Sequence, residues 1–446
     1  MFQKILIANR GEIALRIIRA CRELGIQTVS VHSKADVNSP HVRFSDESVC
    51  IGPAESHLSY LHIPSIISAA EIAGADAIHP GYGFLSENPH FAQICQTCKI
   101  FFVGPSPENI RTLGNKALAK EIMRGAGIPV IPGTNDQADS PEKAKKIARE
   151  IGFPVIIKSC FGGGGRGLRI VQNEDEIENI FFSLQKEASA AFGESLLYIE
   201  KYIEKPKHIE FQILADHYGN IIHLGERDCS IQRRHQKLIE ETPAIKLSKS
   251  LQKKMGETAI KAAKAVNYTS AGTIEFLVDP EENFYFIEVN ARIQVEHPIT
   301  EMITGIDLIK EQIKIASGQK LLMDMSNISF KGHSIECRIN AEDPNKFIPC
   351  SGTITALNIP GGPGVRVDTA IYCDYTVLPY YDSLIAKLIV HGNNREEAIA
   401  KMNQALQEFQ IEGIKTTIPF HREVFKNQDF INGEFYTDFI DSLLLR

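Results

Sequence analysis

Two short segments of the chain alternate apolar and polar residues, which is the pattern of β-strands with one buried face. They span residues 273–278 and 284–290, and the turn-forming residues between them predict a hairpin. If the alternation continues beyond residue 290, one face carries only polar side chains, namely Glu288, Asn290, Arg292, Gln294 and Glu296. The opposite, apolar face is then expected to carry Tyr285, Ile287, Val289 and Ile293.

The hairpin can place Glu275 on the first strand opposite Glu288 on the second, if the register brings them together. At the roughly 5 Å spacing of paired strands, two carboxylates repel each other unless a cation lies between them. Together with the amide oxygen of Asn290, they form a set of hard ligands suited to magnesium or manganese. An ordinary solvated strand face is the alternative, but the polar run that continues to Glu296 favours a site.

The first hundred residues predict an α/β domain with a parallel sheet. An apolar strand at 4–8 is followed by a helix with apolar residues at helical spacing, and then by strands at 28–32, 77–78 and 100–103. A Rossmann dinucleotide site requires GxGxxG after the first strand, whereas NRGEIA contains one glycine. The pattern therefore predicts a doubly wound domain that ends near Gly114 and argues against a nicotinamide site.

A glycine run, Gly162 to Gly165, separates two short apolar strands, with Lys158 before it and Arg166 after it. Successive glycines let backbone N–H groups approach an anion closely and leave a loop free to open and close. The Walker pattern GxxxxGK[ST] is absent, so this is not a P-loop. A flexible linker is the alternative, and we favour a phosphate-binding lid. Lys116, at the start of the preceding helix, is a second candidate for phosphate contact.

Three further segments bear on the site. A strand at 208–213 places His208 and Glu210 on a polar face, and a strand at 334–340 carries Arg338. The run 227–237 contains five basic residues if His235 is counted, and it predicts an anion site, with a solvated basic loop or a non-specific nucleic-acid patch as the alternatives. Residues 300–317 are predicted to form one helix with Ile306 among its inward residues, and the C-terminal part mixes short strands with amphipathic helices.

Composition mainly excludes functions. The 446 residues are enough for about three domains at ~150 residues each. The net charge of −7 argues against a general nucleic-acid binder, and nine cysteines without regular spacing fit a reducing compartment. The one CxxC, Cys95 and Cys98, lacks the additional ligands of a zinc site. Because charges interrupt each apolar run near the N-terminus, we expect a soluble, cytoplasmic protein without a signal peptide or membrane span.

Taken together, these segments resemble the biotin carboxylase branch of the ATP-grasp enzymes over nearly the whole chain. The most specific motifs are IANRGEIA, HPGYGFLSEN, the glycine loop after Lys158, ERDCSIQRRHQK, EVNARIQVEHPITEMITG, ECRINAEDP and PYYDSLIAKL. The resemblance implies an α/β fold, α+β overall, in three parts. These are a Rossmann-like domain (1–114), an ATP-grasp region (115–330) with a mobile lid at about 131–203, and a mixed α+β C-terminal domain (331–446). Phe161 and Leu168 depart from the family pattern.

By this resemblance, the site residues divide by role. ATP would be contacted by Lys116, Lys158, Gly164, Gly165, Glu200, Lys201, Tyr202, Ile203, His208 and His235. Glu275, Glu288 and Asn290 would hold two magnesium or manganese ions, with the two glutamates reaching the nucleotide phosphates through them. Bicarbonate would be bound by Lys237, Arg292, Gln294 and the Val295 backbone, with Glu296 as general base. Arg338 would stabilise the enolate-like oxygen of biotin.

The resemblance implies ATP-dependent carboxylation of biotin by bicarbonate through carboxyphosphate. No AMKM-like biotinyl-lysine motif is found, since Lys401 and Met402 stand in AIAKMNQ, so biotin is expected on a separate carrier protein. The implied assembly is a homodimer that works with the carrier and with carboxyltransferase subunits, as in the acetyl-CoA carboxylase of fatty acid synthesis. The alternatives are the biotin carboxylase of a pyruvate or propionyl-CoA system, another ATP-grasp ligase acting through an acyl phosphate, and a non-catalytic nucleotide sensor.

Overall fold

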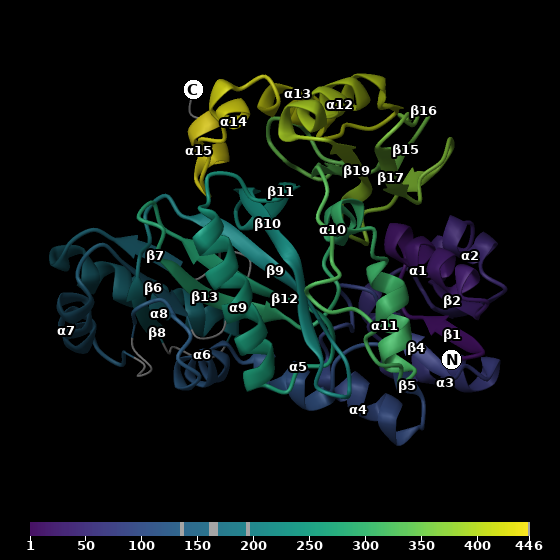
Figure 1. The fold of residues 1–446 in the computed structure, drawn as a ribbon, viewed down its shortest axis with the longest axis horizontal. Coiled ribbons are helices and arrows are strands. Elements are labelled where there is room, and N and C mark those ends of the chain that lie inside the picture. Colours follow the sequence, from purple (N-terminus) through teal and green to yellow (C-terminus); the bar gives the residue numbers. More distant parts are fainter. Residues whose placement is uncertain (134–137, 160–167, 193–196, 445–446) are drawn as a thin grey trace.

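The structure is a computed structural model that describes residues 1–133, 138–159, 168–192 and 197–444. Its N-terminal part contains a parallel sheet, as the sequence predicted, and the five strands of this sheet have the order β3-β2-β1-β4-β5 (Figure 1). Strand β3 was not predicted. The strands are β1 (Lys4–Ile7), β2 (Gln27–Ser33), β3 (Glu47–Gly52), β4 (Ala77–His79) and β5 (Phe101–Phe102). The helices are α1 (Gly11–Glu23), α2 (Pro40–Phe44), α3 (Ile63–Ala73) and α4 (Pro89–Thr97).

Strand β1 shows why this sheet has helices on both faces. Ile5 and Ile7 belong to one apolar cluster with the buried residues of α1, whereas Leu6 belongs to another cluster that includes residues of α3 and α4. Successive side chains of a strand point to opposite faces, so a strand that is apolar throughout must be covered twice.

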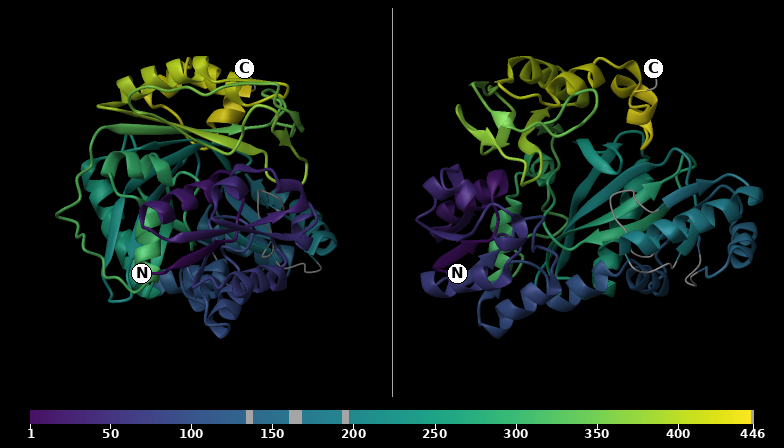
Figure 2. Two further views of the ribbon diagram at one scale, coloured as in Figure 1. Left: turned by 90° about the vertical axis from the view of Figure 1, so that its right-hand side faces the viewer. Right: turned by 180° about the vertical axis from the view of Figure 1, so that it is seen from behind.

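A second, smaller sheet lies at the far end of the molecule (Figures 1 and 2). It has the order β7-β6-β8 and its own apolar core, in which Val155, Ile157 and Phe181 are fully buried. Two helices, α5 (Pro107–Gly114) and α6 (Lys116–Gly125), precede it in the chain. Its elements are α7 (Pro141–Ile151), β6 (Val155–Ser159), β7 (Leu168–Val171), α8 (Ile177–Phe192) and β8 (Leu197–Lys201).

Between these two parts lies an eight-stranded antiparallel sheet in the order β13-β12-β9-β10-β11-β14-β19-β17. The sequence predicted a domain boundary at residue 330, but this sheet contains strands from both sides of that position. Strand β11 before it pairs with strand β14 after it. The strands are β9 (Lys207–Ala215), β10 (Ile221–Arg233), β11 (Gln236–Thr242), β12 (Ser270–Val278), β13 (Phe284–Asn290), β14 (His333–Asn340), β17 (Val365–Thr369) and β19 (Leu384–Gly392).

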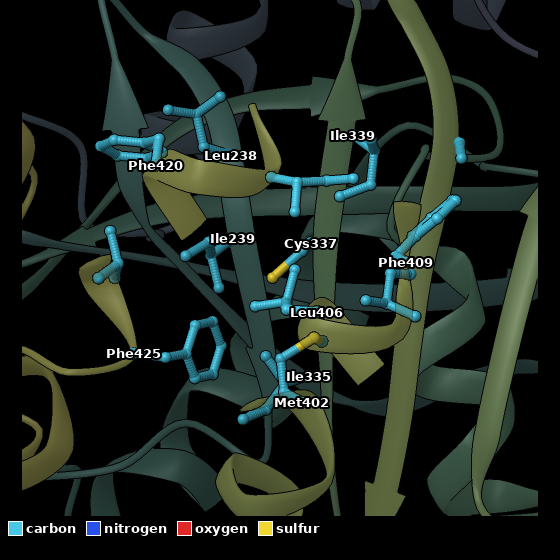
Figure 3. Packing of buried hydrophobic residues seen from close by; sticks show 14 of the residues in the cluster. Leu238, Ile239, Ile335, Cys337, Ile339, Met402, Leu406, Phe409, Phe420 and Phe425 are labelled. Carbon is cyan, nitrogen blue, oxygen red and sulfur yellow. The ribbon is translucent and has the colours of Figure 1, made fainter. Parts of the chain in front are cut away.

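Apolar residues of several helices cover this sheet. Helix α9 (Lys249–Ala265) packs on β9 and β12 through residues such as Met255. The C-terminal helices pack on β11, β14 and β19, where Cys337, Met402 and Phe409 are buried together (Figure 3). Those helices are α12 (Arg395–Glu408), α13 (Ile418–Val424), α14 (Gln428–Asn432) and α15 (Phe439–Leu444). Two pairs of short strands complete the region: β15 (Gly352–Thr353) with β18 (Thr376–Val377), and β16 (Ala356–Asn358) with β20 (Gln410–Glu412).

The single helix predicted for residues 300–317 is wrong. The structure has two helices, α10 (His297–Thr304) and α11 (Leu308–Ala316). Gly305 ends the first in a left-handed conformation with φ of 71°, and the Asp307 side chain caps the second by accepting a hydrogen bond from the Lys310 N–H. Ile306 therefore lies in the connection. Among the described helices, none combines the length and the hydropathy needed to span a bilayer.

Candidate active site

The hairpin of β12 and β13 forms with the predicted register, because Glu275 pairs with Glu288. The next pair is Phe276 with Phe286, so Ile287 is an extra residue in a β-bulge. The bulge reverses the alternation: Phe284 and Phe286 are buried, while Tyr285 and Ile287 are only half-buried. The prediction that Tyr285 and Ile287 share the apolar face with Val289 is therefore wrong, although Glu288 and Asn290 keep their polar side.

Strand β13 ends at Asn290, yet the polar residues after it still converge. Arg292 donates from Nη2 to Asn290 Oδ1 (3.1 Å) and from Nη1 to Gln294 Oε1 (2.9 Å). Gln294 in turn donates to Glu275 Oε1 (3.1 Å). The carbonyl of Val295 accepts a hydrogen bond from Lys387 Nζ (2.9 Å), which holds the turn before α10. Side-chain hydrogen bonds thus replace the strand alternation that the sequence had suggested here.

Lys237 is the centre of the site. Its Nζ lies 2.5 Å from Glu210 Oε2, 2.9 Å from Glu275 Oε1 and 2.7 Å from Glu296 Oε1. The three carboxylates are buried and come from β9, β12 and the segment before α10. Burying three like charges without a cation would be strongly unfavourable, so one ammonium group holds these three chain segments together.

Arg338 joins the site from β14. Ile335, Cys337 and Ile339 pack into the C-terminal core, so Arg338 projects from the opposite face of the strand (Figure 3). It donates from Nε to Glu240 Oε1 (2.6 Å) and from Nη2 to Glu296 Oε2 (3.0 Å). Glu296 is therefore bound on one oxygen by Lys237 and on the other by Arg338.

These contacts set the protonation of the acids. Burial alone would raise the pKa of Glu296, but the charges of Lys237 and Arg338 outweigh it and hold that pKa well below its usual range. Burial would likewise raise the pKa of Glu275, but the charges of Lys237 and His208 lower it. Burial prevails at Glu240, whose pKa is raised to about 7. Near neutral pH, Glu296 is therefore an ionised base between two cations.

The residues predicted to contact ATP lie along the neighbouring edge. Lys116 Nζ pairs with Glu288 Oε2 and Lys158 Nζ with Glu200 Oε2, both at 2.8 Å. His208 Nε2 lies 2.8 Å from Glu275 Oε2. Gly164 and Gly165, with the rest of the glycine run, lie outside the described residues.

Of the four residues 200–203 predicted to contact ATP, Glu200 and Lys201 belong to strand β8. The Lys201 ammonium donates to the carbonyls of Gly152 and Phe153, and the Tyr202 N–H donates to the carbonyl of Pro154. Ile203 follows in a half-buried position. The register of β8 with β6 continues through Lys201, so the first two of these four residues are held in the three-stranded sheet.

The segment 227–237, predicted to be an anion site, does not form the solvated basic loop of the alternative interpretation. The segment is mostly the end of β10 and the start of β11, joined by a tight turn in which Arg234 and His235 have positive φ. Arg227 is fully buried and donates to Glu210 Oε1 (2.5 Å), and Lys237 faces the carboxylates described above. His235 lies in the turn and is exposed to solvent. Partial desolvation by the surrounding chain, together with the charges of Lys158 and His208, lowers its pKa.

The predicted metal ligands fit a divalent cation. Glu275 and Glu288 occupy paired positions on neighbouring strands, and Asn290 Nδ2 donates to Glu275 Oε1 (2.7 Å), while Glu288 Oε2 pairs with Lys116 Nζ. Their hard oxygens are the ligands that magnesium and manganese prefer. Two other groups also bring ligand atoms within 4.8 Å, namely His208, Glu210 and Glu275, and Glu210, Cys229 and Glu296. In both, Lys237 already binds the carboxylates.

Sequence reasoning missed two groups that shape the site. Glu87 accepts hydrogen bonds from Arg292 Nε (2.7 Å) and from the Ala291 N–H (3.0 Å), although it lies 205 positions away from Arg292. Its only signal was its place in the motif HPGYGFLSEN. Glu240, which binds Arg338, carried no pattern that distinguishes it from other strand residues.

Comparison with known proteins identifies the family to which the chain is similar. The description "Biotin carboxylase, N-terminal domain" matches residues 1–110, and "Biotin carboxylase C-terminal domain" matches residues 336–442. Between them, "Carbamoyl-phosphate synthase L chain, ATP binding domain" matches residues 115–323. The chain is 56% identical to the biotin carboxylase of Nostoc sp., with 99% of each chain covered.

The chain belongs to the biotin carboxylase family. It is also 53% identical to a pyruvate carboxylase subunit of Methanothermobacter thermautotrophicus, covering 99% of this chain and 90% of that one. The biotin carboxylase domain dimer of 2-oxoglutarate carboxylase from Hydrogenobacter thermophilus, solved with MgADP, ADP and bicarbonate, superimposes with a TM-score of 0.94 at 51% identity. That comparison covers 99% of this chain and 98% of the other. The predicted family and ATP-grasp fold are thus confirmed, and this biotin carboxylase family member is an ATP-dependent ligase.

Proposed function

We propose that the protein carboxylates biotin carried on a separate carrier protein, with bicarbonate and ATP as the other substrates. The observation that carries this proposal is Glu296, a fully buried carboxylate held ionised between Lys237 and Arg338. A base in this position can take the proton of a bicarbonate ion bound beside it, because its two neighbours also attract the anion. The Hydrogenobacter relative, solved with MgADP and bicarbonate, supports the choice of substrates.

Bicarbonate would lie against Arg292, Gln294, Lys237 and the Val295 backbone. The Arg292 fork is already fixed by Glu87 and Gln294, so it need not be ordered when the anion binds. Glu296 removes the proton, and the resulting oxygen attacks the terminal phosphate of ATP to give carboxyphosphate and ADP. Carboxyphosphate then breaks down into carbon dioxide and phosphate, and the phosphate removes the ureido proton of biotin. Arg338 would stabilise the negative oxygen that results.

The nucleotide would lie along Lys116, Lys158, the 200–203 segment, His208 and His235, with the glycine run around 164–165 over the phosphates. Glu275, Glu288 and Asn290 would hold magnesium or manganese. When bound, these ions would neutralise the negative charge that moves onto the departing ADP. In this structure Lys116 and Lys237 balance the two glutamates, so binding of ions would displace or rearrange these ammonium groups.

We further propose that the protein is a homodimer and catalyses the first half-reaction of an acetyl-CoA carboxylase that contains separate carrier and carboxyltransferase subunits. The dimeric Hydrogenobacter domain supports the first part. A role in a pyruvate carboxylase is the second candidate, favoured by the similarity to the Methanothermobacter protein over 99% of this chain. Reconstitution with biotinylated carriers and each carboxyltransferase would distinguish the two.

The test is phosphate release from magnesium ATP and bicarbonate, with and without free biotin. We expect release to need bicarbonate, to rise with biotin, and to collapse in Glu296→Ala. Glu257→Ala is the matched control, because Glu257 is exposed on α9 and its ion pair with Lys253 spans 4.0 Å at the surface. Release that ignores biotin but rises with an amine or amino acid would refute the proposed substrate while leaving the ATP-grasp fold in place.

A further inference from the structure

Glu200 is a buried carboxylate with two lysine partners. It lies on β8, its side chain is 4% exposed, and its Oε2 is 2.8 Å from Lys158 Nζ. Its other oxygen, Oε1, is paired with the ammonium of Lys120. The two lysines come from different parts of the fold: Lys158 is on β6 within the three-stranded sheet, whereas Lys120 is on α6, which precedes that sheet in the chain.

The contact with Lys158 follows from the strand register. Glu200 pairs with Ile156, and Lys158 pairs with Tyr198, so Lys158 and Glu200 are diagonal neighbours on one face of the sheet. The contact with Lys120 does not follow from the sheet, because it requires α6 to place an ammonium group against a neighbouring element. Lys120 is also mostly buried, with 14% of its side chain exposed.

The charges do not balance. One carboxylate faces two ammonium groups, and both lie near the ring of Tyr198, with Nζ at 5.7 Å for Lys120 and 5.9 Å for Lys158. A second lysine in a buried cluster costs desolvation and repels the first, and burial does lower the pKa of Lys120 despite Glu200. An arrangement that costs free energy in the folded protein requires a reason beyond stabilising Glu200, since one lysine would suffice.

We propose that Lys120 is a positioning residue for the nucleotide: it keeps Glu200 paired, so that Lys158 can turn from Glu200 to a nucleotide phosphate. Without Lys120, that movement would leave a buried carboxylate without a cation, which is strongly unfavourable. With Lys120 present, Glu200 stays neutralised and Lys158 is released. This inference rests on the proposed nucleotide-binding function and extends it to a residue outside the predicted ATP contacts.

The test is the affinity for ADP with magnesium, measured by isothermal titration calorimetry without bicarbonate or biotin. We expect Lys120→Met to weaken binding by about tenfold, the size of one hydrogen bond to a charged group. Lys120→Arg, which keeps the charge, should bind within about twofold of the wild type. Lys145→Met is the matched control, because Lys145 pairs with Glu178 on the outer helices of the same small domain and should bind as the wild type.

A double-mutant cycle separates this role from a merely structural one. Our explanation predicts that Lys120→Met weakens ADP binding in the wild type but causes no further loss in the Glu200→Gln background, because no buried charge then captures Lys158. An equal loss in both backgrounds, or no loss in either, would overturn the inference. If Lys120→Met does not fold, Lys120→Gln provides the same cycle with a smaller change. A wild type that does not bind ADP at all would refute the proposed function itself.

Discussion

Replacing Lys237 by methionine removes the ammonium that holds Glu210, Glu275 and Glu296 together. Each carboxylate keeps one other ion-pair partner: Arg227 for Glu210, His208 for Glu275 and Arg338 for Glu296. Removing one partner of a buried ion pair typically costs about 3–5 kcal/mol. Because no carboxylate is left alone, we expect a loss of about 3 kcal/mol in the free energy of unfolding, and a protein that still folds.

The same substitution should move the acidic limb of the pH–rate profile. Lys237 makes the largest of the attractions that hold the pKa of Glu296 low against its burial. An adjacent opposite charge lowers the pKa of a carboxyl by about 1–3 units, so its loss should raise the apparent pKa of the residual activity by at least about 1 unit. The sign follows because a general base must be ionised, and the rate therefore falls as the pH drops through its pKa.

Urea denaturation gives the stability of Lys237→Met, and bicarbonate-dependent ATP cleavage, measured from the lowest pH at which the protein stays folded up to about pH 9, gives the profile. Lys253→Met is the control, because Lys253 is 80% exposed on α9 and should change neither quantity. Wild-type stability together with an unshifted acidic limb would refute the inference that Lys237 holds the three acids and tunes Glu296.

Three further substitutions test other parts of the molecule. Arg338→Ala should lower turnover by about 10²–10³-fold, as expected for a lost oxyanion contact, while the affinity for magnesium ADP stays within about twofold; unchanged turnover would contradict its role. Glu241→Gln should reduce the free energy of unfolding at pH 7 by about 3 kcal/mol, because His333 and Arg395 overcome the effect of burial and lower the pKa of Glu241 from 4.5 to about 2. This stabilisation is complete above about pH 4.5 and is lost as the pH falls toward 2. Equal denaturation midpoints of the wild type and Glu241→Gln at pH 7 would contradict the prediction. Phe409→Ala should reduce the free energy of unfolding by about 3–5 kcal/mol, because it leaves a cavity in the C-terminal core (Figure 3). It should not move the pH–rate profile. A reduction below about 1 kcal/mol in the denaturation experiment would contradict this prediction and show that the core collapses around the smaller side chain.

Local patterns predicted those parts of the fold whose geometry is itself local. The alternation in β12 and β13 and the turn formers between them fixed the hairpin, including the pairing of Glu275 with Glu288. Four of the five N-terminal strands were readable for the same reason, since short apolar runs between turns have few other structures open to them. Strand β3 was missed because its residues are mostly exposed or half-buried and form no long apolar run.

The bulge at Ile287 could not be read in this way, because it depends on how β13 pairs with β12 and packs in the core. The break between α10 and α11 did carry a signal, Gly305 followed by Asp307, but the regular spacing of isoleucines obscured it.

The chemistry of the site was harder to predict than its location. A basic residue in a sequence gives no sign of whether it is exposed or buried against acids, and Arg227 and Lys237 are buried because β9 and β12 bring Glu210 and Glu275 beside them. Contacts across more than a hundred positions, such as Glu87 with Arg292, follow only from the assembled fold. These contacts are what turn a polar strand face into a set of fixed, ionised groups.

The most direct test of the central claim follows the carbon of bicarbonate. The wild type would be incubated with labelled bicarbonate, ATP, magnesium and free biotin, and the label on biotin would be measured. The proposed function predicts carboxybiotin that forms only when ATP is present and is lost in Glu296→Ala. Cleavage of ATP without label on biotin, or with label on another acceptor, would contradict it.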